Sequence, residues 1–277
     1  MNRREAAVGF WRGCVMAFVG VGVWIGWLPP PSLVVGGWKD RPLQRLALNA
    51  FFGAALCMIF ACAATSGADP GLVEWDLQGM SAALQHVMEY GGPPPDFDDV
   101  SMLRRPLRSK LCRESGGVNI ARFDHFCIWI NRPIGAGNHL LFVCFVFLQI
   151  LSIGLFLILS TSLLLDTDPD VSFFISAVNA PRGGLLVISS FGLVVMASLL
   201  FLFLFQIRGI LLNVTTNEFM NMERYPHFWR GPIGRDGKRT FLNPFDKGLL
   251  GNINEFLGIG GHVEYVRLFR YLMRHKK

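Results

Sequence analysis

The longest uncharged run of this 277-residue chain, from Leu140 to Leu165, constrains the fold more than any other feature. Its 26 residues carry no ionisable side chain. A helix of that length, rising ~1.5 Å per residue, exceeds the roughly 30 Å hydrocarbon core of a bilayer. Two further runs, Leu46 to Ala68 and Gly183 to Ile207, hold 23 and 25 residues without a charge. The chain is therefore predicted to be a polytopic membrane protein.

A fourth span is predicted near the amino terminus. Gly13 to Leu28 offers only 16 apolar residues before three consecutive prolines, so the helix should begin before Arg12, whose side chain would reach the head groups. A cleavable signal peptide is the alternative interpretation of this segment. Trp24 and Trp27 argue against it, because they stand where a signal peptidase needs small residues.

The distribution of Lys and Arg predicts the orientation. Four spans place both termini on one side, where 22 of the 26 basic residues then lie, and only 4 remain in the two short connections. Under the positive-inside rule both termini and the segment between the second and third spans are cytosolic. The formal charge of +6 thus reflects topology, and no nucleic-acid partner is expected.

The predicted fold is an all-α polytopic membrane protein with four parts. Transmembrane helices 1 and 2 lie in 1–68, and a cytosolic catalytic loop segment follows in 69–138. Transmembrane helices 3 and 4 lie in 139–207, and a cytosolic amphipathic C-terminal region occupies 208–277.

Two cytosolic stretches show helical periodicity. Apolar residues recur on one face of the stretch from Leu72 to Tyr90, which predicts an amphipathic helix. A second stripe, Val263 to Met273, is flanked by Arg and Lys, a pattern typical of helices that lie on a membrane surface. The glycosylation sequon that begins at Asn213 would face the cytosol in this topology, so it is not read as a glycan site.

Asp124, His125 and Cys127 lie close together between the second and third predicted spans. A thiol with an ordinary pKa of about 8.5 is mostly protonated at cytosolic pH. An imidazole within reach can take that proton, and a carboxylate can fix the imidazole tautomer. The three residues thus form a candidate nucleophile, base and orienter. The spacing also leaves open a buried cysteine beside a structural histidine.

Around these residues the sequence resembles the DHHC protein S-acyltransferases. The signature reads Asp124-His125-Phe126-Cys127, so this is a DHFC variant. Three further motifs of the family are matched in order on the four-span frame, and the resemblance is greatest to the ankyrin-bearing subgroup, although no ankyrin repeats precede this core. The matching residues are Trp129, Asn131, Gly135 and Asn138-His139 after the signature, then Asp69-Pro70-Gly71, Thr215-Thr216-Asn217-Glu218, and Asn243-Pro244-Phe245 with Gly248, Asn252 and Phe256.

The resemblance implies an enzyme that transfers a long-chain acyl group, palmitoyl being expected, from acyl-CoA to membrane-proximal cysteines of substrate proteins. Cys127 would carry the acyl group as a thioester, with His125 as base and Asp124 as its orienter. The acyl chain would lie among the membrane helices, so the lipid bilayer is also a partner, and the family suggests the Golgi or endoplasmic reticulum membrane. Other residues would support the site: Trp129 beside the acyl chain, Asn138 after the signature, Thr216 and Glu218 behind the catalytic residues, and Asn252 against the catalytic loop.

Members of that family fold this segment around two zinc ions held by eight ligands, and this sequence keeps only Cys112 of them. A structural zinc site needs four good ligands. We therefore expect no zinc and no other cofactor, with acyl-CoA serving as co-substrate. Apolar packing by Leu111, Phe123, Phe126 and Ile128 would replace the metal. The other ligand positions hold Asp98, Ser101, Leu111, Phe126 and Pro133, and no cysteine occurs from Ser115 to Asn119.

Two other functions compete with this enzyme. A catalytically inactive relative could serve as a membrane scaffold or binding protein. A small transporter or channel is disfavoured, because the spans carry almost no ionisable groups apart from Arg12. Retention of Asp124, His125 and Cys127 among the lost zinc ligands favours the enzyme.

Overall fold

The computed structural model describes residues 42–73, 77–92, 94, 97–98, 103–165, 182–230 and 240–259. Within this part the chain forms two compact units. One comprises residues 42–65 with 141–205, and the other comprises 66–140 with 206–259. The predicted first span and the C-terminal amphipathic stripe lie outside the described residues. Most residues of the two short connections between the predicted spans, 29–45 and 166–182, lie outside them as well.

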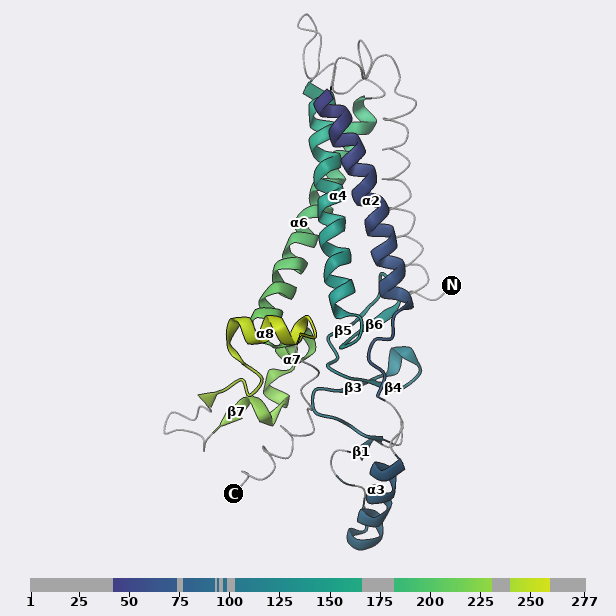
Figure 1. Ribbon diagram of the computed structural model, residues 1–277, viewed down its shortest axis with the longest axis vertical. Helices are drawn as coiled ribbons and strands as arrows, with labels where there is room; N and C mark the ends of the chain where they lie inside the picture. Colours follow the sequence, from purple (N-terminus) through teal and green to yellow (C-terminus); the bar gives the residue numbers. More distant parts are fainter. Residues whose placement is uncertain are drawn as a thin grey trace, which may run out of the picture. The chain divides into compact units, whose positions relative to one another are not determined.

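Three helices of the described chain are long and apolar enough to cross a bilayer. They are α2 (Pro42–Gly67), α4 (His139–Leu165) and α6 (Arg182–Leu212), drawn side by side in Figure 1. Helices α4 and α6 contain the uncharged runs that begin at Leu140 and Gly183, and α2 ends at Gly67, one residue before the end of the third run. Helix α6 continues past Ile207 to Leu212. The chain is thus a polytopic membrane protein, as the length of these runs indicated.

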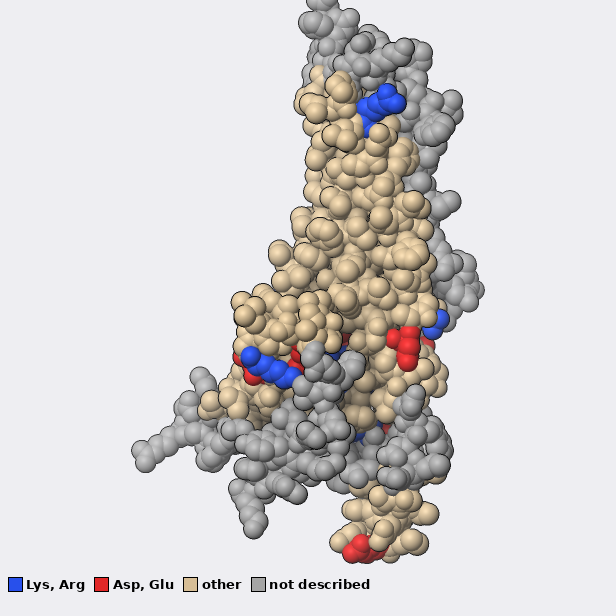
Figure 2. Space-filling view, in the orientation of Figure 1, with Lys and Arg blue, Asp and Glu red and all other residues tan. Residues whose placement is uncertain are grey.

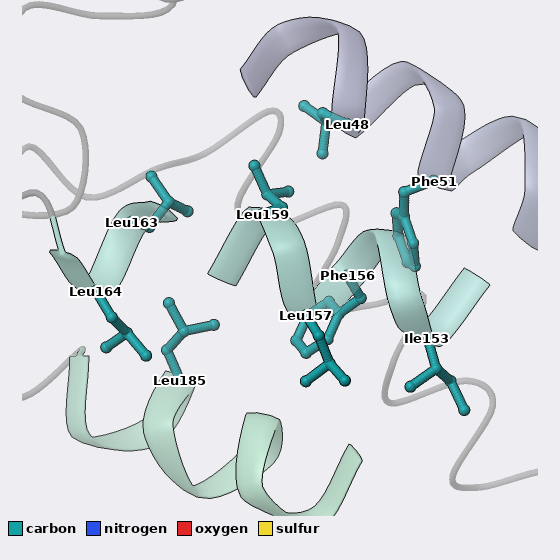
Figure 3. Close-up of a cluster of buried hydrophobic side chains, with 9 residues drawn as sticks. All are labelled: Leu48, Phe51, Ile153, Phe156, Leu157, Leu159, Leu163, Leu164 and Leu185. Atoms are coloured by element: carbon teal, nitrogen blue, oxygen red, sulfur yellow. The ribbon is translucent and has the colours of Figure 1, made fainter. Parts of the chain in front are cut away.

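Aromatic and branched side chains pack α2, α4 and α6 together. The Phe51 ring of α2 lies 6.0 Å from the Phe156 ring of α4, centroid to centroid. Figure 3 shows the whole cluster, which comprises Leu48, Phe51, Ile153, Phe156, Leu157, Leu159, Leu163, Leu164 and Leu185. On the outer faces large apolar residues stay exposed, among them Phe201, and Figure 2 shows a helical surface with hardly any charged atoms. Such a surface suits a lipid solvent.

The second unit adds short β-hairpins to the predicted helices, so the chain is mostly helical and not all-α. Two hairpins matter for the site: β3 (Lys110–Cys112) pairs with β4 (Val118–Ile120), and β5 (His125–Cys127) pairs with β6 (Arg132–Ile134). Strands this short leave almost no period-two pattern in a sequence. Two further antiparallel pairs are β1 (Phe97–Asp98) with β2 (Leu103–Arg104), and β7 (Trp229–Arg230) with β8 (Thr240–Phe241).

The Asp69-Pro70-Gly71 turn fixes the end of the β5–β6 hairpin. Asp69 Oδ1 accepts hydrogen bonds from the amides of Gly71 and Leu72, which closes the turn. Gly137 N donates to Pro70 O over 3.2 Å, and Ala121 N donates to Gly71 O over 2.8 Å. A side chain at Gly137 would collide with the Asp69 carbonyl, so this close approach requires glycine.

The amphipathic helix predicted for 72–90 is shorter in the structure. Helix α3 spans Leu77–Tyr90. Leu72 instead forms an antiparallel bridge with Ile120 of β4, because the preceding turn directs the chain along that strand. Leu84 and Met88 on the exposed side of α3 are 61% and 75% accessible, so the predicted apolar face is not covered by the described residues.

Short helices follow α6 and complete the unit. The elements are α7 (Thr216–Met220), the 3₁₀ turns η3 (Met222–Arg224) and η4 (Pro226–Phe228), and α8 (Gly248–Phe256). Thr215 caps α7 in a capping box, in which its hydroxyl accepts from Glu218 N and Glu218 Oε2 accepts from Thr215 N. The cap fixes the direction in which the first amides of α7 point.

Candidate active site

Strand β5 places His125 and Cys127 on the same face of a hairpin. Side chains alternate along a strand, so residues two apart point to one side. The hairpin register pairs His125 with Ile134 and Cys127 with Arg132. Ile134 is completely buried and Cys127 is 4% exposed. The strand therefore supplies the backbone conformation that allows a base and a nucleophile to meet at this spacing.

Asp124 fixes the tautomer of His125. His125 Nδ1 lies 2.7 Å from Asp124 Oδ2. A carboxylate can only accept a hydrogen bond, so Nδ1 must carry the proton. The other ring nitrogen, Nε2, is then the basic one. It is the atom that can accept a proton from a thiol.

The Asp124 carboxylate accepts three more hydrogen bonds. Thr216 donates twice, from its amide to Oδ1 over 2.7 Å and from its hydroxyl to Oδ2 over 2.9 Å. Gln206 Nε2 donates to Oδ2 over 3.1 Å, while its Oε1 lies 2.7 Å from His139 Nε2. Asp124 is 1% exposed, so these donors replace the water that burial removes.

The donors keep Asp124 ionised in spite of its burial. Burial by itself raises the pKa of a carboxyl group, because the charged form loses its hydration. Here His139, the hydrogen bond and charge of His125, and the amide of Thr216 outweigh burial, and they hold the pKa of Asp124 far below its ordinary value. The residue is thus a permanent negative charge beside the imidazole.

His125 is correspondingly held in its protonated form. Burial would lower the pKa of the imidazole, but the hydrogen bonds to Asp124 and Cys127 and the charges of both groups raise the pKa of His125 to about 9. A proton taken from the Cys127 thiol would therefore be well stabilised on the ring. The arrangement can activate a thiol as a nucleophile.

The pKa of His125 should also make stability depend on pH. The pKa is 6.5 in the unfolded chain and about 9 in the folded one, so between these values the folded state binds more protons. The contribution of His125 to the free energy of unfolding is fully present below about pH 6.5 and is lost as the pH rises through about 9. Melting temperatures of the wild type and His125→Gln in detergent, compared across this range, should converge as the pH rises. A difference that stays constant or widens would contradict the assignment.

The family comparison agrees with this geometry. Residues 94–223 match the model of the DHHC palmitoyltransferase family. Residues 94–223 therefore form a domain of the DHHC palmitoyltransferase type. Similar curated proteins are palmitoyltransferase AKR1 of Yarrowia lipolytica (30% identity over 221 residues, 75% of this chain and 28% of that protein) and palmitoyltransferase ZDHHC17 of Danio rerio (26% over 229 residues, 79% and 35%). Palmitoyltransferase Hip14 of Drosophila melanogaster is 28% identical over 198 residues, which are 68% of this chain and 30% of that protein.

The chain covers about a third or less of the length of these relatives. Most of each relative therefore has no counterpart in the match. The matched part includes the DHHC domain with Asp124, His125, Cys127 and Thr216.

The described residues of the DHHC domain do not fit zinc. Cys112 Sγ lies 3.5 Å from Ser115 Oγ and packs in an apolar cluster with Ile120 and Phe123, against which Phe126 also lies. No group of three or more His, Cys, Asp or Glu side chains that could hold a metal gathers among the described residues. Cys112 is 1% exposed, and Glu114 Oε2 also lies 3.7 Å from its sulfur. These neighbours fall short of the four donors that a tetrahedral zinc site needs.

The other residues expected at the site occupy different places. Trp129 is 44% exposed in the turn between β5 and β6. Asn138 is buried and follows the β5–β6 hairpin. Its Oδ1 accepts a hydrogen bond from Gly135 N, and its Nδ2 donates one to Pro133 O. Asn252 is also buried, and its amide donates to Leu211 O over 2.7 Å. It thus ties the C-terminal segment to the end of α6, whereas the resemblance suggested the catalytic loop.

Gln206 and His139 were not anticipated as parts of the site. Gln206 is the only side-chain amide in the uncharged run from Gly183 to Ile207. A lone amide in an apolar run is a sequence signal for a buried polar contact. A buried amide in an apolar helix needs a partner, and here it has three, Asp124, Thr216 and His139. The helix α6 thereby contributes directly to the orientation of the DHHC aspartate.

A pocket of about 720 Å³ opens beside the candidate catalytic residues. Its wall includes Asp124 and His125, and three basic side chains, Arg105, Lys110 and Arg113, line it as well. The remaining lining residues are Asp98, Leu111, Glu114, Phe123, Phe126, Thr216, Asn217 and Met220. Its size is in the range of pockets that hold cofactor-sized molecules. Asp98, Glu114 and Asp124 balance the three basic side chains, so an anion would be bound by individual basic groups and not by an excess of positive charge.

Proposed function

We propose that this chain is a protein S-acyltransferase that carries a long-chain acyl group on Cys127. The observation that carries the proposal is the continuous set of contacts from Thr216 through Asp124 and His125 to Cys127 within a DHHC domain. It contains a nucleophile, a base with the correct tautomer, and a charged orienter. The substrates would be acyl-CoA and cysteine thiols of proteins at the membrane.

Before the first step the Cys127 proton would be held on His125 Nε2. The Cys127 sulfur would then attack the carbonyl carbon of the acyl-CoA thioester. The tetrahedral intermediate then collapses, the bond between the carbonyl carbon and the coenzyme A sulfur breaks, and the leaving thiolate accepts the proton from His125. In the second step a substrate cysteine attacks the Cys127 thioester in the same way. Cys127 is regenerated, and Asp124 keeps His125 oriented throughout.

The pocket beside His125 suits the polar part of acyl-CoA. Arg105, Lys110 and Arg113 could pair with its phosphate groups, and the pocket reaches the imidazole that the reaction needs. The apolar acyl chain would gain ~0.8 kcal/mol for each methylene group removed from water. Palmitoyl-CoA is the expected donor, because the similar proteins are named palmitoyltransferases.

We further propose that both termini and the catalytic unit face the cytosol, in the Golgi or endoplasmic reticulum membrane. The excess of basic residues in 69–138 and after Ile207 supports this orientation. Protease protection of a tag at Lys277 in sealed microsomes would contradict it.

Turnover tests the proposed function. Purified protein is incubated with palmitoyl-CoA and a membrane-anchored peptide with one cysteine, and release of free coenzyme A is followed. We expect release that depends on the protein and acylation of the peptide. A folded protein that releases coenzyme A no faster than a blank reaction would instead be an inactive scaffold with this fold.

Zinc content is expected to be well below one ion per chain. The only cysteine left from the family's ligand set, Cys112, is enclosed by Ile120 and Phe123, and four donors are needed. Metal analysis of the detergent-purified protein measures this directly. Phe126→His is the matched variant: it should neither raise the zinc content nor improve activity, because one added imidazole cannot complete a site. One or two zinc ions per chain would contradict the account.

A further inference from the structure

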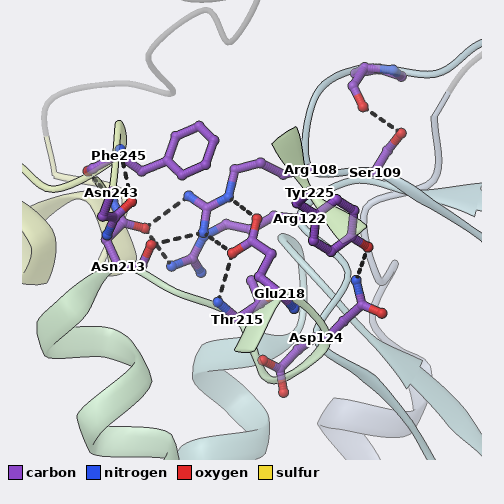
Figure 4. A network of polar contacts seen from close by, with 12 residues as sticks. Arg108, Ser109, Arg122, Asp124, Asn213, Thr215, Glu218, Tyr225, Asn243 and Phe245 are labelled. Carbon is purple, nitrogen blue, oxygen red and sulfur yellow. Dashed lines mark hydrogen bonds and ion pairs between the residues drawn. The ribbon is translucent and has the colours of Figure 1, made fainter. Parts of the chain in front are cut away.

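Two buried arginines meet at Asn213 behind the candidate active site (Figure 4). Arg108 binds Glu218 with two nitrogens, Nε at 2.6 Å from Oε1 and Nη2 at 2.7 Å from Oε2. Its Nη1 donates to Asn213 Oδ1 over 2.9 Å, and Arg122 Nη2 donates to the same oxygen over 3.1 Å. Asn213 is fully buried, and each arginine is 7% exposed. Charges at this depth require complete pairing.

The same network reaches the C-terminal segment. Asn213 Nδ2 donates to Phe245 O over 2.9 Å and to Glu255 Oε2 over 3.0 Å. The Arg108 guanidinium also lies over the Phe245 ring, 4.2 Å from its centroid. Residues more than 100 positions apart in the sequence are therefore held at one point. The side-chain amide of Asn213, the first residue of the sequon, is thus enclosed within the network.

Backbone strain gathers at the same point. Four described residues other than glycine have positive φ, and three of them are Arg108 (69°), Arg122 (46°) and Asn213 (49°). Left-handed conformations are costly for residues with a Cβ atom and persist only where surrounding contacts impose them. The three strained residues share Asn213 Oδ1. This coincidence indicates that the network serves a purpose beyond packing.

A short path leads from the network to the reacting groups. Arg108 holds Glu218, whose Oε2 accepts from Thr215 N over 2.8 Å in the capping box of α7. The next residue, Thr216, donates its amide and hydroxyl to Asp124. From the other side, Arg122 lies two residues before Asp124 in the chain. Displacement of α7 or of the loop would therefore move the carboxylate that orients His125.

We propose that Arg108 and Arg122 are positioning residues for the acyl transfer, which hold α7 and the catalytic loop around Asn213 so that Asp124 keeps His125 directed at Cys127. The inference rests on the proposed function for its activity readout. It assigns a task to three residues, Arg108, Arg122 and Asn213, that lie outside the reacting set.

The charge pair between Arg108 and Glu218 allows a sharp test. Removal of one partner leaves the other buried without its main ion pair, whereas removal of both takes the two charges away together. Arg108 Nη1 also lies 4.0 Å from Glu255 Oε1, but Glu255 keeps Lys247 as a partner at 2.8 Å. The variants are Arg108→Gln, Glu218→Gln, the double variant, and Arg108→Lys, which keeps the charge but loses the two-pronged geometry. Arg224→Gln is the matched control, because Arg224 is exposed and on the same unit. Unfolding temperature and gel filtration establish that each protein is folded.

Two readouts separate positioning from simple loss of structure. The first is the rate at which Cys127 is labelled by palmitoyl-CoA. The second is the pH at which alkylation of Cys127 by iodoacetamide reaches half its maximum rate, followed on the Cys127 peptide by mass spectrometry. Alkylation needs no acyl-CoA and reports how well the imidazolium stabilises a neighbouring thiolate. The charged groups that act most strongly on Asp124 and His125 are each other, His139 and Cys127, and none of these is replaced.

We expect both single glutamine variants, and Arg108→Lys, to label about 10- to 100-fold more slowly and to shift the alkylation midpoint to higher pH. The double variant should lie nearer the wild type than either single variant, and Arg224→Gln should match the wild type. Folded single variants with an unchanged alkylation profile would overturn the proposal, and so would a double variant no better than the singles. If the wild type does not label at all but the midpoints shift as stated, the proposed function fails and the positioning role stands.

Discussion

Replacement of Cys127 by serine is expected to abolish hydroxylamine-sensitive labelling by palmitoyl-CoA. The substitution keeps the shape of the site but exchanges a thiol for an alcohol, a far poorer nucleophile near neutral pH. His125 would still be oriented by Asp124 at 2.7 Å, so the loss would report on the nucleophile alone. Labelling with a fluorescent or radioactive acyl-CoA, followed by gel electrophoresis with and without hydroxylamine, measures it.

Cys112→Ser is the matched control. Cys112 lies in the same unit and is also buried, but its sulfur faces Ser115 and the apolar cluster instead of an imidazole. We expect this variant to label like the wild type, provided that it folds. Labelling that survives in Cys127→Ser and disappears in Cys112→Ser would refute the mechanism while leaving the fold assignment intact.

Asp124→Asn is expected to reduce the labelling rate by about 10²- to 10⁴-fold. The amide retains the size of the carboxylate but can no longer accept from His125, Thr216 and Gln206 together. The side-chain NH₂ group of the new amide would either donate a hydrogen bond to one of these residues or stay buried without an acceptor. The tautomer of the His125 ring would then no longer be fixed. Loss of the negative charge would also let the pKa of His125 fall from about 9.

The control for this variant is Glu223→Gln, a neutral substitution of an exposed acid in η3. It should leave the labelling rate unchanged. Rates are to be measured in a single turnover, so that they report the formation of the Cys127 thioester and not its later transfer. An Asp124→Asn protein that labels at the wild-type rate would contradict the orienting role.

Long-range hydropathy made the membrane helices predictable. A run of 26 uncharged residues can satisfy its backbone only as a helix in lipid, and α4 covers that run completely. The candidate catalytic set of Asp124, His125 and Cys127 was equally predictable from the sequence, because the residues lie within four positions of one another. The β5–β6 hairpin that aligns them was not predicted, since strands of three residues carry too little pattern.

Residues that act through long-range contacts could not be assigned from the sequence. Glu218 is expected in a supporting role from its motif, but its partner Arg108 is 110 positions away and nothing local marks that arginine as buried. Asn213 carried a misleading signal, because its sequon describes a surface acceptor and the residue is fully enclosed. Gln206 was visible as an amide in an apolar run, but its partner Asp124 is 82 positions away. Charges inside a fold become interpretable only when their partners are known.

The most direct test of the acyl-enzyme is the mass of the Cys127 peptide after the purified wild-type protein has met palmitoyl-CoA. We predict that this peptide gains the mass of one palmitoyl group and that neutral hydroxylamine removes it, as expected of a thioester. The peptide with Cys112 should remain unmodified. A folded protein whose Cys127 peptide stays unmodified, or carries an adduct that resists hydroxylamine, would contradict the central claim.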